Sequence, residues 1–151
     1  MPTPRSILMT IFIVFMPPAL QAELKPWDDY DISESLWLVT TIHVSPNMGD
    51  IYLAGLKRSW IPQVEIAKDL GHIEDYKIYR SEPFEGGGFN FMLVVKFRET
   101  ADLAPSKEKY RAFMQQWGEQ QKQSKNEFAR GKYPGMRKIL EQKYVREIKI
   151  K

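Results

Sequence analysis

The chain has 151 residues, with 22 Lys and Arg against 19 Asp and Glu, and contains no cysteine. This length is enough for one domain of ordinary size and not for two, and 43% hydrophobic residues is a globular composition. The absence of cysteine excludes both lipid attachment through a cysteine and a disulfide framework, so the hydrophobic core must be sufficient without disulfides.

Residues 1–22 have the order of features that a cleavable export signal needs. Arg5 supplies a positive start, Ile7 to Met16 is almost entirely apolar, and a small residue, Ala22, lies at the expected cleavage position. The apolar run is shorter than the roughly 20 residues of a membrane span. We therefore expect a mature chain from Glu23, exported to the periplasm or secreted, with no stable membrane span after cleavage. Cleavage removes one basic residue and no acid, which leaves a net charge of +2.

The first half of the mature chain predicts an arm, a strand and a helix. Residues 23–35 are polar and have no sustained period, which favours an N-terminal arm before order begins at Leu36. Residues 36–44 are β-branched or apolar almost throughout and predict a strand. Apolar residues then recur at helical spacing from an N-cap at Asp50 to Gly71, with Pro62 expected to kink or split the helix.

The second half predicts a hairpin, a helix and a last strand. Residues 74–82 and 89–98 are typical of strands, and the glycine-rich segment between them leads into a strand, which favours a hairpin tip over a phosphate-binding loop. A helix should begin at Pro105-Ser106 and end in the break at residues 131–135. We expect a short helix at 136–142 and a final strand at 144–150.

This order of elements, strand, helix, strand, strand, helix, strand, predicts an α+β domain over residues 36–151. It is the ferredoxin-like βαββαβ arrangement, a four-stranded antiparallel sheet with both helices on one face. Alternation along the first and third strands assigns the even-numbered positions of 36–44 and the odd-numbered positions of 89–97 to the helix side. The opposite face is too apolar for a sheet face in water, so something should cover it.

The chain also resembles a known superfamily. The strand ending in Ile42-His43-Val44, the helix from Tyr52 to Gly71 and the segment Asp75-Tyr76-Lys77-Ile78-Tyr79 are together similar to the dimeric α/β-barrel superfamily. In that superfamily two ferredoxin-like subunits pack their open sheet faces together. The resemblance implies a homodimer with a cavity between the sheets, but members differ in chemistry, so it leaves the activity undecided.

The open face supplies the candidate ligand-binding residues, and one of them is ionisable near neutral pH. Antiparallel pairing should place His43 near Asn90 and Met92, and Trp37 toward Lys96 and Arg98. The leading hypothesis is a binding protein for a small, partly apolar molecule. Its expected ligand-binding residues are Trp37, Thr41, His43, Met92 and Arg98.

Two alternatives remain open at this stage. A cofactor-independent monooxygenase or isomerase would use His43 as its catalytic residue. A non-catalytic envelope protein would instead use the basic C-terminal segment, including Lys143, Arg146 and Lys149, to contact a partner or an anionic surface. The sequence has only two His and no spacing that predicts a metal site, and we expect no cofactor and no nucleic-acid partner.

Overall fold

The computed structural model describes residues 23–81, 88–131 and 133–151. The expected signal peptide at residues 1–22 and residues 83–87 of the expected hairpin tip at 83–88 therefore lie outside the described residues. In chain order the elements are β1 (Tyr30–Ile32), β2 (Leu36–Val44), α1 (Gly49–Asp69), β3 (Asp75–Arg80), β4 (Phe91–Phe97), η1 (Thr100–Leu103), α2 (Lys107–Gly131), α3 (Tyr133–Met136), β5 (Arg137–Val145) and β6 (Ile148–Ile150).

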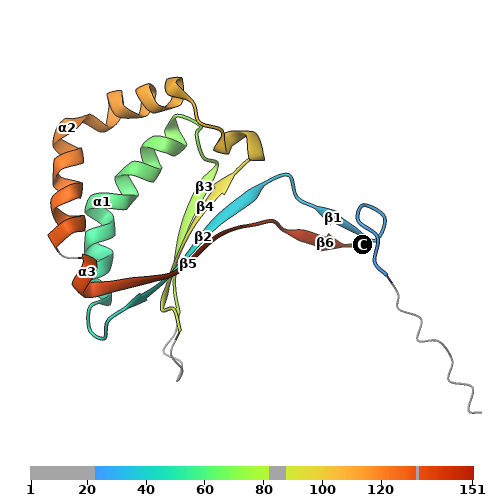
Figure 1. The fold of residues 1–151 in the computed structure, drawn as a ribbon, viewed down its shortest axis with the longest axis horizontal. Helices are drawn as coiled ribbons and strands as arrows, with labels where there is room; N and C mark the ends of the chain where they lie inside the picture. The colour runs from blue at the N-terminus through green and yellow to red at the C-terminus, as the bar shows by residue number, and fades with distance from the viewer. Residues whose placement is uncertain (1–22, 82–87, 132) are drawn as a thin grey trace, which may run out of the picture.

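The main sheet has four strands in the order β3-β4-β2-β5, and every neighbouring pair is antiparallel. All three helices lie on the same side of this sheet (Figure 1). This strand order and the one-sided helices confirm the predicted ferredoxin-like fold. β2 and β4 are the two central strands, so the residues predicted to share the open face do lie on adjacent strands.

The core lies between α1 and the sheet, and it confirms the assignment of side chains to the two faces. Ile42 and Val44 from β2 pack with Phe91 and Leu93 from β4 against Tyr52 and Leu56 from α1. Ile42 is opposite Phe91, and Thr40 is opposite Leu93, so these side chains point to the same side of the sheet. The Tyr52 and Phe91 rings pack edge to face, and their centroids are 5.3 Å apart.

A second, two-stranded sheet forms an arm that projects from the main sheet (Figure 1). β1 pairs antiparallel with β6, from Tyr30 opposite Ile150 to Ile32 opposite Ile148. The expectation that order begins only at Leu36 was wrong, because a three-residue strand inside a polar segment has no sequence period of its own. Arg146 holds the base of the arm by donating to the Ser33 and Glu34 carbonyl oxygens.

The final strand and the short helix differ from the sequence-based expectation. The short helix is Tyr133–Met136, and the segment expected to be helical is the first half of a strand, β5. Its sequence, rich in Lys, Leu, Glu and Gln, favours a helix, but pairing with β2 satisfies its backbone along most of its length. Nearly all of β5 is exposed, which explains the missing apolar alternation.

The two long helices also differ in detail from their predictions. α1 begins at Gly49 after Met48, so Asp50 lies in the first turn and is not the N-cap. The helix runs unbroken past Pro62 and is not split. α2 changes direction at Gly118, whose φ of 68° and ψ of 160° are not helical. Along the described part of the chain, no helix is both long and apolar enough to cross a membrane.

Candidate functional site

The face of the main sheet that points away from the helices carries the predicted ligand-binding residues, and we call it the open face. On β2 and β4, Thr41 is directly opposite Met92 and Val39 is directly opposite Val94. Thr41, Met92 and Val39 are half-buried in the single chain. The open face of the two central strands consists of Trp37, Val39, Thr41 and His43 on β2 and of Met92, Val94 and Lys96 on β4.

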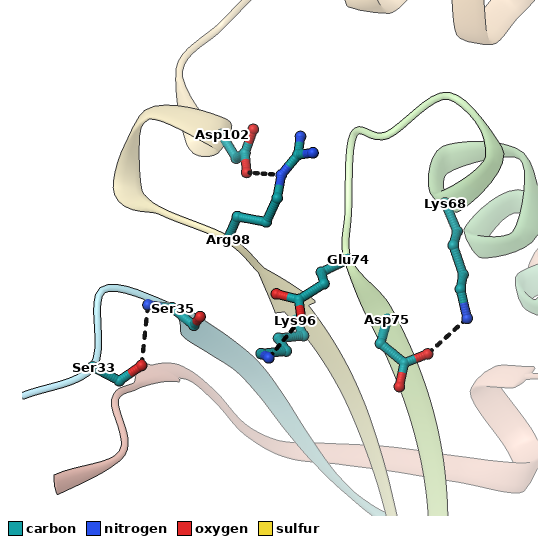
Figure 2. Close-up of polar contacts among 8 residues, drawn as sticks. All are labelled: Ser33, Ser35, Lys68, Glu74, Asp75, Lys96, Arg98 and Asp102. Atoms are coloured by element: carbon teal, nitrogen blue, oxygen red, sulfur yellow. Dashed lines mark hydrogen bonds and ion pairs between the residues drawn. The ribbon is translucent and has the colours of Figure 1, made fainter.

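Trp37 lies at one end of the open face, between two lysine side chains. The Lys96 ammonium is 5.3 Å from the indole centroid, and the Lys77 ammonium from β3 is 5.8 Å from it. Lys77 is opposite Val94 in the pairing of β3 with β4, and Val94 is 6% exposed. Lys96 also forms an ion pair with Glu74 at 2.7 Å (Figure 2). Trp37 therefore presents an aromatic surface whose position is stabilised by cation–π contacts with the two lysines.

His43 lies at the other end of β2. Next to it, the side chain of Asn90 extends the pairing of β2 with β4. Asn90 accepts a hydrogen bond from the Val44 N–H and donates one to the Val44 carbonyl, both at 2.7 Å. The His43 ring is exposed, and its Nδ1 lies 2.9 Å from the Gly88 carbonyl oxygen. His43 is thus near Asn90, as predicted, and the carbonyl fixes its tautomer as protonated on Nδ1 when the ring is neutral.

Arg98 does not join the other four candidates. It follows the end of β4, and in Figure 2 its side chain runs toward Asp102 in η1. It donates to the Gly71 carbonyl at 2.6 Å and lies 3.5 Å from the Asp102 carboxylate. Burial raises the pKa of Asp102, but hydrogen bonds from Lys109 and Arg98 outweigh it and leave the pKa below its ordinary value. The structure therefore gives Arg98 a place in the contacts that join the end of α1 to η1.

Charged residues of β5 border the open face. Glu141 is opposite Thr41 and Lys143 is opposite Val39, and their side chains form an exposed ion pair at 2.9 Å. Lys138 is opposite His43. The open face therefore has an apolar centre and a charged border, the arrangement found where a sheet face packs against another protein surface.

A second candidate site lies on the helix side of the sheet, and the sequence did not reveal it. A cavity of about 150 Å³, which we call the helix-side cavity, is bounded by α1, α3 and the sheet. It is lined by the apolar side chains of Leu56, Trp60 and Leu93 and by the polar side chains of Ser59, Gln63, Tyr133 and Arg137.

The polar residues of the helix-side cavity form one connected network. Ser59 donates to the Gly55 carbonyl at 2.8 Å, and its oxygen lies 2.8 Å from the Tyr133 hydroxyl. The Arg137 guanidinium stacks 4.1 Å from the Tyr133 centroid and donates to the Tyr52 hydroxyl at 3.1 Å. Burial raises the pKa of Tyr52, and the nearby Arg137 charge offsets part of that effect.

Sequence reasoning missed this network because its members come from distant segments. Ser59 lies on the predicted apolar helix, and a polar residue on its buried side was the available signal. Tyr133 lies in the segment that was expected to break the helix, and Arg137 in a segment expected to be helical. No cluster of three or more His, Cys, Asp or Glu that could hold a metal ion occurs among the described residues.

No protein-family model and no curated protein matches this chain. Among solved structures, HapK from Hahella chejuensis is similar at 12% identity and a TM-score of 0.43, over 73% of this chain and 90% of HapK. A dimeric ferredoxin-like protein from an uncultured marine organism is similar at 10% identity and a TM-score of 0.42, over 79% of this chain and 90% of its own. A dimeric ferredoxin-like protein of unknown function from Thermobifida fusca is similar at 8% identity and a TM-score of 0.39, over 76% of this chain and 91% of its own. These are likenesses of fold.

Proposed function

We propose that this chain is an exported, homodimeric binding protein that holds a small, partly apolar molecule between the open faces of two paired sheets. The observation that carries the proposal is the apolar centre of the open face. Val39, Thr41 and Met92 are left partly exposed there by the single chain. Pairing with a second copy would remove this surface from water. The free energy of that transfer is favourable by roughly 25 cal/mol for each Å² of apolar area buried.

The walls of the proposed ligand space differ at its two ends. Trp37, held between Lys77 and Lys96, offers an aromatic surface at one end. His43 offers a ring nitrogen at the other, because only Nδ1 is used by the Gly88 carbonyl. A ligand with an apolar body and one polar group suits this arrangement, with Thr41 and Met92 beneath its centre.

A neutral apolar dye tests the binding proposal directly. We expect Nile red to bind the mature chain with an increase in fluorescence. Met92→Lys should weaken this binding more than tenfold, because the dye would then share its space with an unpaired charge. Ala54→Lys is the matched control, since Ala54 is exposed on α1. Equal binding by Met92→Lys and the unmodified chain would refute the proposal.

The enzymatic alternative, a cofactor-independent monooxygenase or isomerase, depends on His43. In the described part of the chain, no hydrogen bond or ion pair joins His43 to another ionisable side chain, so a proton relay would need a group from the ligand or a second copy. A panel of quinol-like substrates, assayed with the unmodified chain and with His43→Ala, tests this role. Equal rates in the two proteins would reject it.

The alternative of an envelope interaction protein depends on the basic C-terminal segment. Arg146 already binds the Ser33 and Glu34 carbonyls at the base of the arm, so it is structural here. Lys149 on β6 is exposed, and Lys143 is paired with Glu141. Binding to anionic vesicles that is lost in a Lys143→Gln, Lys149→Gln double variant and weakens with salt would support this alternative. Salt-insensitive binding would count against it.

A further inference from the structure

We propose that the helix-side cavity is a second ligand site and that its ligand is a small carboxylate with an apolar body. The cavity lies on the opposite side of the sheet from the open face, so this site does not depend on the pairing of two copies. Its volume is about 150 Å³, and an apolar cavity of roughly that volume can hold a single-ring molecule such as benzene.

Of the described residues that line the cavity, Arg137 is the one that carries a charge. Its nearest partners are neutral: one N–H donates to the Tyr52 hydroxyl, and the guanidinium plane stacks on the Tyr133 ring. Among the residues whose side chains the structure describes, which leaves out 1–22, 82–87, 119–130, 132 and 134, no carboxylate lies within ion-pair distance of Arg137. A guanidinium has five N–H groups in a planar fork, and a carboxylate is the group that this fork binds best.

The hydroxyl groups of the cavity do not compete with Arg137 for an anion. Ser59 has one hydroxyl proton and gives it to the Gly55 carbonyl, so the Ser59 oxygen accepts the proton of Tyr133. Both hydroxyl protons are therefore used within the protein. The Gln63 amide donates to the Ser59 carbonyl, so the guanidinium is the charged donor of the lining, and a ligand should present acceptor oxygens to it.

The rest of the lining selects the body of the ligand. Leu56 and Leu93 are buried, and Trp60 is half-buried and stacks edge to face with Tyr76. These side chains leave an apolar space beside a single positive charge. One negative charge on a compact apolar body matches the cavity, whereas a polyanion would leave its further charges without partners.

The test is calorimetric titration of the mature chain with benzoate and with benzamide, which has the same ring and no charge. We expect benzoate to bind at least tenfold more tightly than benzamide, and Arg137→Gln to remove this preference. Arg80→Gln is the matched control, because Arg80 also lies over an aromatic ring, 5.8 Å from the Phe91 centroid, but outside the cavity. It should keep the preference.

The location of the ligand is tested by NMR on the unmodified chain, which needs no variant of Arg137. Benzoate should shift the indole N–H signal of Trp60, assigned with Trp60→Phe, and leave that of Trp37 unchanged. Equal affinity for benzoate and benzamide, no heat at millimolar benzoate, or a shift of Trp37 in place of Trp60 would overturn the proposal. Because this cavity is separate from the open face, Met92→Lys should bind benzoate normally even if the dimer is lost.

Discussion

The side chain of Asn90 stabilises the end of β2 that carries His43, and replacing it is the most informative stability experiment. The carboxamide binds both backbone groups of Val44 at 2.7 Å, as a neighbouring strand would. Val44 is 1% exposed, so in Asn90→Ala these backbone groups lose partners that water replaces poorly. Each lost hydrogen bond costs about 1 kcal/mol, and desolvated groups left without partners add to that. We expect the free energy of unfolding to fall by about 2 to 3 kcal/mol.

Urea denaturation followed by circular dichroism measures this loss, and the slope of the transition should stay unchanged because the same surface unfolds. Asn90→Asp separates the two hydrogen bonds. The carboxylate still accepts from the Val44 N–H, but it cannot donate to the Val44 carbonyl and places two acceptors against each other. Asn90→Asp should therefore also destabilise the protein. A fall below about 0.5 kcal/mol for Asn90→Ala, the level of an ordinary surface substitution, would refute the reasoning.

Three further predictions follow from other parts of the structure. Tyr133→Phe should lower the free energy of unfolding by about 1 kcal/mol in urea, because the Ser59 oxygen loses its donor, whereas Tyr144→Phe, at an exposed ring, should change it little. Burial, and next the charge of Lys109, lowers the pKa of His72 below 6.5, so stability should be complete above pH 6.5 and decrease as the pH falls through 6.5 toward the folded pKa. His72→Gln should flatten that slope, and an unchanged slope would contradict the assignment. Arg146→Ala should release the arm from Ser33 and Glu34 and speed limited proteolysis near residue 147, whereas equal digestion rates would show that the arm is held elsewhere.

The fold could be predicted from the sequence where burial of one side of an element makes apolar residues recur at a regular spacing. β2 is buried along its helix-facing side, so its nine residues are almost all apolar or β-branched and its bounds were predicted as observed. The strand order then predicted antiparallel pairing of β2 with β4, with His43 near Asn90 and Trp37 toward Lys96, and Trp37 is indeed opposite Lys96. Four of the five predicted ligand-binding residues, Trp37, Thr41, His43 and Met92, lie on the open face for this reason.

The sequence failed where the structure depends on contacts between distant segments. β5 is mostly exposed, so no apolar alternation distinguishes RKILEQKYV from a helix, and only its pairing with β2 makes it a strand. Arg98 was assigned to the open face by alternation, but β4 ends at Phe97 and the side chain binds the Gly71 carbonyl instead. The contact between Ser59 and Tyr133 spans 74 positions, and no local pattern records it.

The pairing of two open faces is the central claim, and the mass of the mature chain in solution tests it most directly. Sedimentation equilibrium at micromolar concentration should give twice the mass of one chain, and Val39→Glu should reduce it to one chain, because a charge would be buried at the centre of the interface. Ala54→Glu, which adds the same charge at an exposed position on α1, should remain a dimer. A single-chain mass for the unmodified protein, or a dimer that persists in Val39→Glu, would contradict the account.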